Sequence, residues 1–313
     1  MYHLQIRETL RSPLKIVAPT YNADTGGDQI VAHFAGEVKG RVFLITGASP
    51  NGLGEFFAKA SPKLIIFAAR NAEKGEVTAS SIKGINSAVQ TRVLHLDLTT
   101  FASIRKAAQE VNSYAENINV LVNNTGIMAV LYSKTKEGHE SHWQSNCLSH
   151  FLFTNLIIDK ILHSGPTSRA VNIRSGGYRL GGTANILFTA ELARRLAGKG
   201  LVAVALSPGN VYANLATHGA TGKFDDLWAL CRKIEDSLGW RQPNPLDPNH
   251  GVANHAYAAL APAFKDFNGD YMCSLEELPD PIEEMSPWAV GELKGKKSWE
   301  LSEKLVEQKF DFK

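Results

Sequence analysis

The chain has 313 residues, 44% of them hydrophobic, and a formal net charge of +2 at pH 7. This length fits one large α/β domain or one domain with appendages, and the hydrophobic content supports a substantial core. The nearly neutral charge gives no electrostatic basis for binding nucleic acid or an anionic membrane surface, and neither partner is expected.

The three cysteines, Cys147, Cys231 and Cys273, are far apart and include no Cys-x-x-Cys spacing. A zinc site and a disulfide framework are therefore not expected, whereas a reducing compartment, and so a cytoplasmic location, is. No apolar run approaches the roughly 18 residues of a membrane span. The first eight residues contain an acid and lack the apolar segment of a secretory signal.

Residues 1–40 are predicted to form an N-terminal arm, followed by one domain over residues 41–313. Pro13, Pro19 and the pair Gly26-Gly27 interrupt any long element in the arm, and its hydrophobic periodicity is weak. Two interpretations stay open. The arm either packs on the domain or contacts another subunit of an oligomer.

The next segment, residues 42–70, predicts a strand, a glycine-bearing turn, a short helix and a second strand. This is the opening of a nucleotide-binding βαβ unit. Glycines allow the backbone to approach a diphosphate closely, and the first N–H groups of the following helix point at the anion. The predicted binding residues of this turn are Gly47, Asn51, Gly52, Leu53 and Gly54. An ordinary βα turn is the alternative.

Arg70 ends the second predicted strand. Domains that bind NAD carry an acid about 20 residues after the glycines, whereas an arginine there accommodates the 2′-phosphate of NADP. The sequence therefore favours NADP(H). The alternative is a surface cation at the end of a strand.

After Arg70, predicted strands and helices alternate. Strands are expected at 93–96, 120–122, 170–173 and 202–206, and helices at 71–82, 100–114, 139–162 and 183–196. Asn71 is the candidate N-cap of the first of these helices. Because the strands are nearly continuous apolar runs, helices should cover both faces of the sheet. Right-handed crossovers then give an α/β fold with a doubly wound parallel (Rossmann) sheet.

The chain resembles the short-chain dehydrogenases/reductases, and within them the branch that includes retinol-dehydrogenase-like enzymes and many fungal pathway members. The resemblance runs from about Gly40 to Lys304. It rests on the shared order of motifs: Thr46–Gly54, His95–Leu98, Asn123–Gly126, Ser145–Phe151, Val171–Ser175, Thr183–Phe188, Ser207–Gly209 and Asn268–Tyr271.

The resemblance implies roles for residues at the ends of the strands. Asp97, beside Leu98, would accept a hydrogen bond from the adenine amino group. Asn123 would hold the adenosine side and brace the central strand. Pro208, Gly209 and Val211 would border the nicotinamide. Ser175 would bind the substrate carbonyl oxygen, and Asn146 would organise a proton-relay water. From the residues alone, Asp97 could instead cap the next helix, and Asn123 could complete a turn.

The family's reaction also needs a tyrosine followed four residues later by a lysine that lowers the tyrosine pKa. Here Tyr178 has the tyrosine spacing, but Gly182 stands at the lysine position. Tyr178 also follows Ser175 by three residues, where related sequences have a loop of about a dozen or more. We infer that Tyr178 belongs to the start of that loop and that a deletion between Leu180 and Thr183 removed the catalytic pair.

Two smaller departures from the family lie near the glycine turn. Asn51 is one residue more than the commonest spacing of the turn, and asparagine tolerates left-handed backbone. From Gly54 to Arg70 is 16 residues, where the family usually has about 20, so the helix is expected to lack one turn.

Other features are weaker. His139 and His142 could hold a metal from one helix face, but no third ligand is in register, and a solvated helix start is expected. Lys294–Lys297 is interpreted as a solvated loop. Residues 298–308 predict a closing amphipathic helix with Leu301 and Leu305 on its apolar face. Residues 219–248 would cover the substrate or pack in the core.

Two functions remain open. One is an NADP(H)-dependent oxidoreductase acting on a carbonyl or alcohol of a small apolar metabolite, as in secondary metabolism. Ser175 would polarise the oxygen, and Tyr178, another donor or water would supply the proton. The other is a catalytically silent protein that binds a nucleotide or a partner, or the product of a truncated gene model. Dimers and tetramers are common in the family, so a homo-oligomer is among the expectations.

Overall fold

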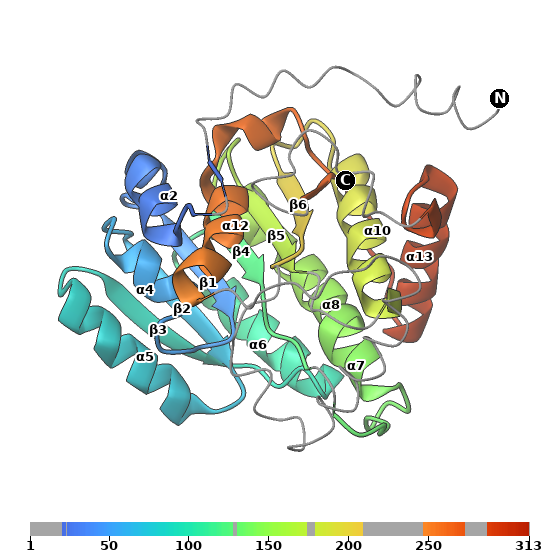
Figure 1. Cartoon of the computed structure of the whole chain (residues 1–313). Helices are drawn as coiled ribbons and strands as arrows, with labels where there is room; N and C mark the ends of the chain where they lie inside the picture. The colour runs from blue at the N-terminus through green and yellow to red at the C-terminus, as the bar shows by residue number, and fades with distance from the viewer. Residues whose placement is uncertain are drawn as a thin grey trace, which may run out of the picture.

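The computed structural model describes residues 21–22, 24–127, 130–173, 179–208, 247–272 and 287–312. A seven-stranded sheet runs through the molecule in the order β3-β2-β1-β4-β5-β6-β7, and every neighbouring pair is parallel. Helices lie on both sides of it (Figure 1). The predicted doubly wound parallel sheet is thus confirmed.

Five of the strands coincide with the predicted apolar runs, whereas β3 begins three residues before the predicted 93–96 and β7 was not predicted. They are β1 (Val42–Thr46), β2 (Leu64–Ala69), β3 (Gln90–His95), β4 (Val120–Asn123), β5 (Arg169–Ile173), β6 (Val202–Leu206) and β7 (Tyr271–Met272). All residues of β1, β4, β5 and β6 are buried. Strand β3, at one edge of the sheet, differs in that both its first and last residues are exposed.

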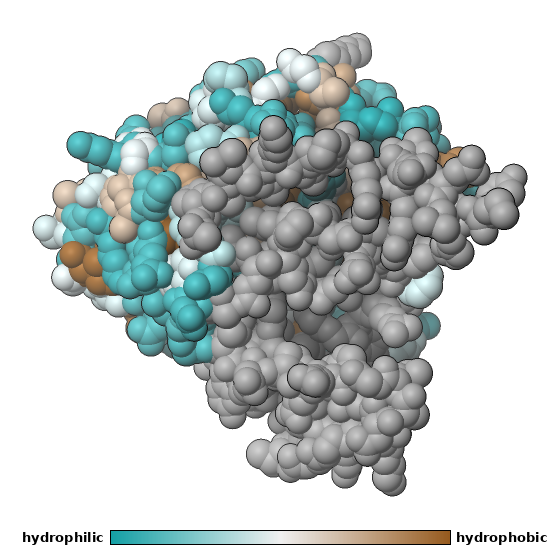
Figure 2. Space-filling view, turned by 45° about the horizontal axis from the view of Figure 1, so that its top comes forward, coloured by the Kyte–Doolittle hydropathy of each residue, from teal (hydrophilic) through white to brown (hydrophobic). Residues whose placement is uncertain are grey.

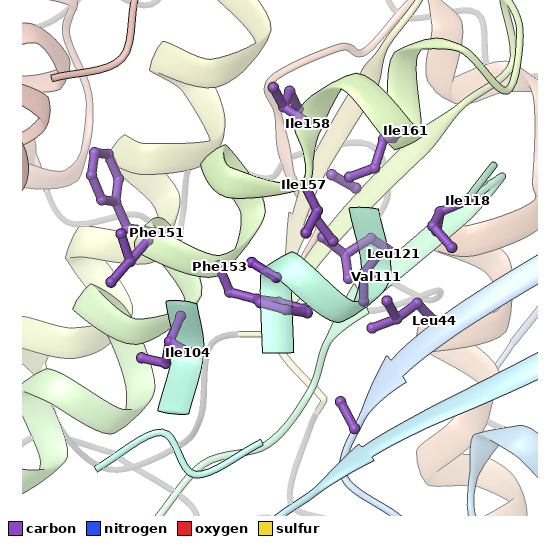
Figure 3. Packing of buried hydrophobic residues seen from close by; sticks show 14 of the residues in the cluster. Leu44, Ile104, Val111, Ile118, Leu121, Phe151, Phe153, Ile157, Ile158 and Ile161 are labelled. Carbon is purple, nitrogen blue, oxygen red and sulfur yellow. The ribbon is translucent and has the colours of Figure 1, made fainter. Parts of the chain in front are cut away.

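Two hydrophobic clusters fill the space between the sheet and its helical layers. Phe43 and Ile45 of β1 pack with α2 (Gly27–His33), α4 (Leu53–Ala58) and α12 (Pro248–Leu260). Val42 and Leu44 face the opposite layer, since successive side chains of a strand alternate. Figure 3 shows that second cluster from close by. Fully burying one such aliphatic or aromatic side chain contributes about 1.5–3 kcal/mol.

The second layer contains α6 (Phe101–Ser113), α8 (Ser149–Leu156), α9 (Ile158–Leu162), α10 (Arg179–Arg195) and α13 (Glu292–Leu305). Helix α5 (Ala72–Ile85) lies beside β2 and β3. The N-cap predicted for α5 is confirmed, because the Asn71 side chain accepts a hydrogen bond from the Lys74 N–H. Thr100 caps α6 in the same way by accepting from the Ser103 N–H.

The continuous helix predicted over residues 139–162 is wrong. The segment contains α7 (Ser141–Trp143), one π-helical turn, η1 (Gln144–Leu148), and then α8 and α9. Ile157 separates the last two helices with φ −110° and ψ 9°, outside helical geometry. A π-turn inserts one residue and realigns the backbone groups around it, which the hydrophobic pattern does not record.

The C-terminal helix was predicted with the wrong boundaries and the wrong face. Helix α13 begins at Glu292, so Lys294–Lys297 lies within a helix and not in a loop. Leu301 is 48% exposed, whereas Trp299 is buried. Trp299 packs against Phe151 and Phe188, with ring centroids 4.9 and 5.9 Å away. One large aromatic ring therefore set the orientation of α13 along α10 (Figure 1).

Within the predicted N-terminal arm, residues 24–40 form α2 and α3 (Ala35–Val38). Ile30 and Val31 of α2 are buried in the first cluster, and the Asp28 N–H donates to Asn249 Oδ1 at the start of α12. This part of the arm packs on the domain. Among the described helices, none is long and apolar enough to cross a membrane. The described surface visible in Figure 2 is mostly hydrophilic, with scattered hydrophobic residues.

Candidate functional site

The carboxyl ends of the parallel strands bring the predicted site residues to one edge of the sheet. Thr46 and Gly47 end β1, and Arg70 and Asp97 follow the neighbouring strands β2 and β3. Asn123 ends β4 on the other side of β1, and Pro208 follows β6. Ligands of such sheets bind at this edge, near the point where the strand order reverses. That point lies between β1 and β4 here.

The turn after β1 has the backbone that its residues predict. Gly47 has φ 94°, and a Cβ built on it would lie 2.8 Å from Thr125 Oγ1, so only glycine fits. Asn51 has φ 58°, the left-handed conformation that asparagine tolerates. The extra residue of the loop is therefore accommodated. Gly52 is the N-cap of α4 and offers no side chain to the first N–H groups of that helix.

Gly54 also has a packing role that the sequence did not predict. A Cβ built there would lie 2.5 Å from the ring of Phe67 on β2, a side chain that is itself buried. The glycine lets α4 pack tightly against the sheet. Leu53 is also buried, so only its backbone can face a ligand. Helix α4 has six residues, consistent with the short spacing from Gly54 to Arg70 in the sequence.

Arg70 is exposed beside this turn, since β1 and β2 are paired and the Gly47 N–H donates to Ala68 O at 2.7 Å. Asp97 is half-buried. Its Oδ1 accepts from the N–H and hydroxyl of Thr99, at 2.9 and 2.7 Å. The carboxylate thus shapes the turn that leads to α6, whose cap is Thr100 and not Asp97. Leu98 is buried, and its carbonyl accepts from the Ser149 hydroxyl at 2.6 Å.

The side chain of Asn123 is buried between β4 and the helices behind it. Its Nδ2 donates to Asn172 Oδ1 on β5 and to Thr154 Oγ1 on α8, both at 2.8 Å. Asn172 in turn donates to Thr189 Oγ1 on α10 at 2.9 Å. The side chain therefore braces the central strand, as expected. Contact with an adenosine would have to come from its backbone.

Asn146 lies in the π-turn, a geometry that is frequent at functional sites. Its side chain makes two bonds to Ile127 after β4: Oδ1 accepts from the N–H at 2.8 Å, and Nδ2 donates to the carbonyl at 2.9 Å. Its carbonyl accepts from Asn185 Nδ2 on α10 at 3.0 Å. Asn146 therefore joins the ends of β4 and β5, since Asn185 also donates to Ile173 O.

Two polar residues of the site had no predicted role. His150 lies between Thr46 and Asn146, with burial lowering its pKa to about 4. Glu137 reaches the start of α6, where the Phe101 N–H donates to it at 2.7 Å. Burial opposes the charge of Glu137, but hydrogen bonds from Gln144 and Phe101 outweigh it and hold the pKa below its usual range. Polarity inside an apolar helical pattern was the available signal for His150.

Cys147 is not placed as a reactive thiol, and His139 and His142 are not placed as a metal site. Burial raises the pKa of Cys147 to about 12, so its thiol stays protonated. His142 is buried with Nδ1 2.7 Å from Glu140 Oε1, which contradicts the expected solvated helix start. Within the described ranges, no three His, Cys, Asp or Glu side chains are placed to hold a metal ion.

On the reaction side of the site, Ser175, Tyr178, Gly209 and Val211 lie outside the described residues. Helix α10 begins at Arg179, four residues earlier than predicted, so residues 180–183 are helical. Gly182, at the expected lysine position, is buried within this first turn. The described part of the site thus combines the strand ends where a nucleotide is expected with a helix that has glycine where the resemblance requires an amine.

A family model described as short chain dehydrogenase matches residues 41–222, more than half of the chain. The chain belongs to the short-chain dehydrogenase/reductase family. Its relatives include retinol dehydrogenase 11 of Mus musculus, 31% identical over 260 residues that cover 75% of this chain and 78% of the relative. Retinol dehydrogenase 14 of Homo sapiens is 30% identical over 319 residues, covering 90% and 89%. The family resemblance read from the motifs is confirmed, and the chain is a retinol-dehydrogenase-like member of this oxidoreductase family.

Solved structures support the same fold. L-sorbose reductase from Gluconobacter frateurii, complexed with NADPH and L-sorbose, has a TM-score of 0.59 at 17% identity, covering 76% of this chain and 96% of that one. A NAD⁺-bound xylitol dehydrogenase has a TM-score of 0.58 at 19% identity, covering 75% and 98%. One neighbour is a complex with NADPH and the other with NAD⁺, and at these identities the likeness shows the fold alone.

Proposed function

We propose that this short-chain dehydrogenase/reductase binds NADP(H) and acts on a carbonyl or alcohol group of a small apolar metabolite, as in secondary metabolism. The observation that carries the proposal is Arg70, which is exposed at the end of β2 beside the glycine turn. A guanidinium there matches the charge and geometry of a 2′-phosphate.

The residues at the sheet edge fit such a coenzyme. Side chains are excluded at Gly47 by its φ and by the contact with Thr125, so the turn presents backbone. The N-cap of α4 is a glycine without a capping side chain, which leaves the first helical N–H groups to another acceptor. When bound, the coenzyme supplies or accepts the hydride.

In this proposal each group of the chain has a limited task. Gly47, Asn51 and Gly52 bind the diphosphate through the backbone, and Arg70 selects the 2′-phosphate. Pro208, Gly209 and Val211 border the nicotinamide. Ser175 holds the substrate oxygen, and Tyr178, another donor or water supplies the proton. Asn146, fixed at both its side chain and its carbonyl, organises a proton-relay water.

Calorimetric titration tests the coenzyme assignment directly. The purified chain should bind NADPH, and bind NADH more weakly. NADPH at 100 times its dissociation constant should add about 2.7 kcal/mol to the free energy of unfolding, measurable as a thermal shift. A folded protein that binds neither coenzyme contradicts the proposal, and tighter binding of NADH contradicts the role of Arg70.

A second candidate function is favoured by Gly182. A buried glycine at the lysine position provides no ammonium to lower a tyrosine pKa. The chain would then be a silent member that binds a nucleotide or a partner. A thermal shift with NADPH, but no turnover of generic ketones or aldehydes, supports this function. Turnover in the Gly182→Lys variant alone would identify the missing amine as the cause.

The transcript across residues 180–183 distinguishes loss of the segment from an incomplete gene model. A Tyr-x-x-x-Lys segment in the message restores the enzyme function for the natural protein. Its absence from the message, together with NADPH binding and no turnover, leaves the silent function.

A further inference from the structure

His150 is a buried histidine whose two ring nitrogens contact different parts of the site. Its Nε2 lies 3.2 Å from Thr46 Oγ1, at the end of β1. Its Nδ1 lies 3.4 Å from the carbonyl oxygen of Asn146, one turn earlier in the helical segment. The ring therefore spans the gap between the glycine turn and the π-turn.

The surrounding bonds determine which nitrogen carries the proton. The Thr46 hydroxyl accepts from the N–H groups of Asn124 and Thr125, at 2.9 and 3.0 Å. A hydroxyl has two acceptor positions and one hydrogen, so Thr46 must donate that hydrogen to His150 Nε2. The proton of the neutral ring is then on Nδ1, which donates to Asn146 O. A neutral ring is also what its complete burial favours at pH 7.

These hydrogen bonds form a closed network around the switch point of the sheet, between β1 and β4. The segment after β4 is bound to Thr46 at Asn124 and Thr125, and to the Asn146 side chain at Ile127. His150 completes this network by joining Thr46 to the Asn146 carbonyl. Gly47 follows Thr46 directly and packs against Thr125, so any shift of Thr46 moves the glycine turn.

We propose that His150 is a positioning residue of the coenzyme site, which holds Thr46 and the glycine turn in place relative to Asn146. The inference rests on the proposed coenzyme binding. It assigns a role in that binding to a buried side chain.

His255 in α12 provides a matched control. It is also buried, and its Nδ1 lies 2.8 Å from the carbonyl oxygen of Gly251, four residues earlier. Burial lowers the pKa of both histidines to about 4. The difference is the Nε2 bond of His150 to Thr46. Replacing either histidine costs packing and a helical hydrogen bond, but only His150 connects to the glycine turn.

The test measures the dissociation constant of NADPH by calorimetry, well below each variant's melting temperature. His150→Leu should weaken binding about tenfold, as expected when a buried hydroxyl loses its partner and shifts. His150→Gln places an amide oxygen near the Nε2 position and should bind within about twofold of the wild type. His150→Asn keeps only the Nδ1 position and should behave like the leucine variant. His255→Leu should lower stability and leave NADPH binding unchanged.

Several results would overturn the inference. They are wild-type affinity in all His150 variants, retained affinity in the asparagine variant but not the glutamine variant, or an equal loss in His255→Leu. If His150→Leu does not fold, the glutamine and asparagine variants decide the question. A wild-type protein that binds neither NADPH nor NADH defeats the proposed function as well, whereas wild-type binding with unaffected variants defeats this inference alone.

Discussion

The two halves of the site differ in how they depend on side chains. The coenzyme half, from β1 to β4, uses a backbone turn, strand ends and buried amides, and its described parts fit together by many hydrogen bonds. The reaction half, from β5 to α10, depends in this family on a tyrosine and a lysine, and here Gly182 occupies the lysine position. A binding site that uses mainly backbone groups tolerates substitutions that would abolish a reaction dependent on two side chains.

The halves also differ in how a deletion affects them. Helix α4 is short but still packs on β2 because Gly54 allows close contact. In the reaction half, α10 runs without a break through residues 180–183, where we infer a deletion. If both segments were shortened, the fold accommodated each change with regular helix. Loss of chemistry would be decided by which residues were removed and not by loss of structure.

The largest expected effect is acid destabilisation through the buried histidines, one of which belongs to the coenzyme half. Burial lowers the pKa of His150 and His255 to about 4, against about 6.5 when unfolded. The unfolded chain then binds more protons than the native chain as pH falls from 6.5 toward 4, so stability is lost in that window. Each histidine should cost about 2 kcal/mol between pH 7 and 5, measured by urea unfolding.

Variants separate the two histidines in this experiment. His255→Leu should remove about half of the pH dependence, and so should His150→Leu. His250 acts in the opposite direction, since its hydrogen bond with Asp247 raises its pKa, but it lies at the surface. A wild-type protein with equal stability at pH 7 and pH 5 would show that neither ring is kept neutral by burial.

The second expected effect concerns the reaction half. If the chain is active, Ser175→Ala should lower kcat by about 100-fold or more, because the substrate oxygen loses its polarising donor. The dissociation constant of NADPH should not change. Ser168→Ala is the matched control, since Ser168 precedes β5 while Ser175 follows it, and Ser168 is buried away from the site edge. Equal kcat in both variants would remove Ser175 from the reaction.

The sequence predicted the strands and the parallel sheet because buried parallel strands are apolar runs with clear ends. It also predicted the left-handed Asn51 and the cap at Asn71, which depend on local conformational preferences. Within the coenzyme half, it correctly brought Gly47, Arg70 and Asp97 to one edge. These features need only neighbours in the chain or the order of the strands.

Features set by contacts between distant residues were not predictable. Gly54 is required by Phe67, which is 13 positions away on β2. The face of α13 is set by Trp299 packing on Phe151 and Phe188, so the pair Leu301 and Leu305 gave the wrong orientation. The π-turn follows no hydrophobic period, and it concealed the environment of His150. Each failure involves a tertiary contact that overrides a local pattern.

Gly54→Ala tests whether Gly54 is required for packing, in contrast to Gly47, which is required by its backbone conformation. The added methyl group would meet the buried ring of Phe67, which has little room to move, and should cost about 2 kcal/mol of unfolding free energy. Urea unfolding measures this cost. Gly84→Ala is the control, since a Cβ there has nothing within 4 Å and improves helix propensity in α5. Equal stability of both variants would show that contact with Phe67 is not what requires glycine at position 54.

The smallest expected effect is the one that decides between the coenzymes. Arg70→Ala should raise the dissociation constant of NADPH about tenfold, because a charge-assisted hydrogen bond to the 2′-phosphate is lost at an exposed position. NADH lacks that phosphate, so its binding should not change. Lys83→Ala removes the same charge at the far end of α5 and should leave both affinities unaltered. If Arg70→Ala weakens NADPH and NADH equally, Arg70 contributes only general electrostatic attraction. The coenzyme half would then bind nicotinamide coenzymes without selecting between them.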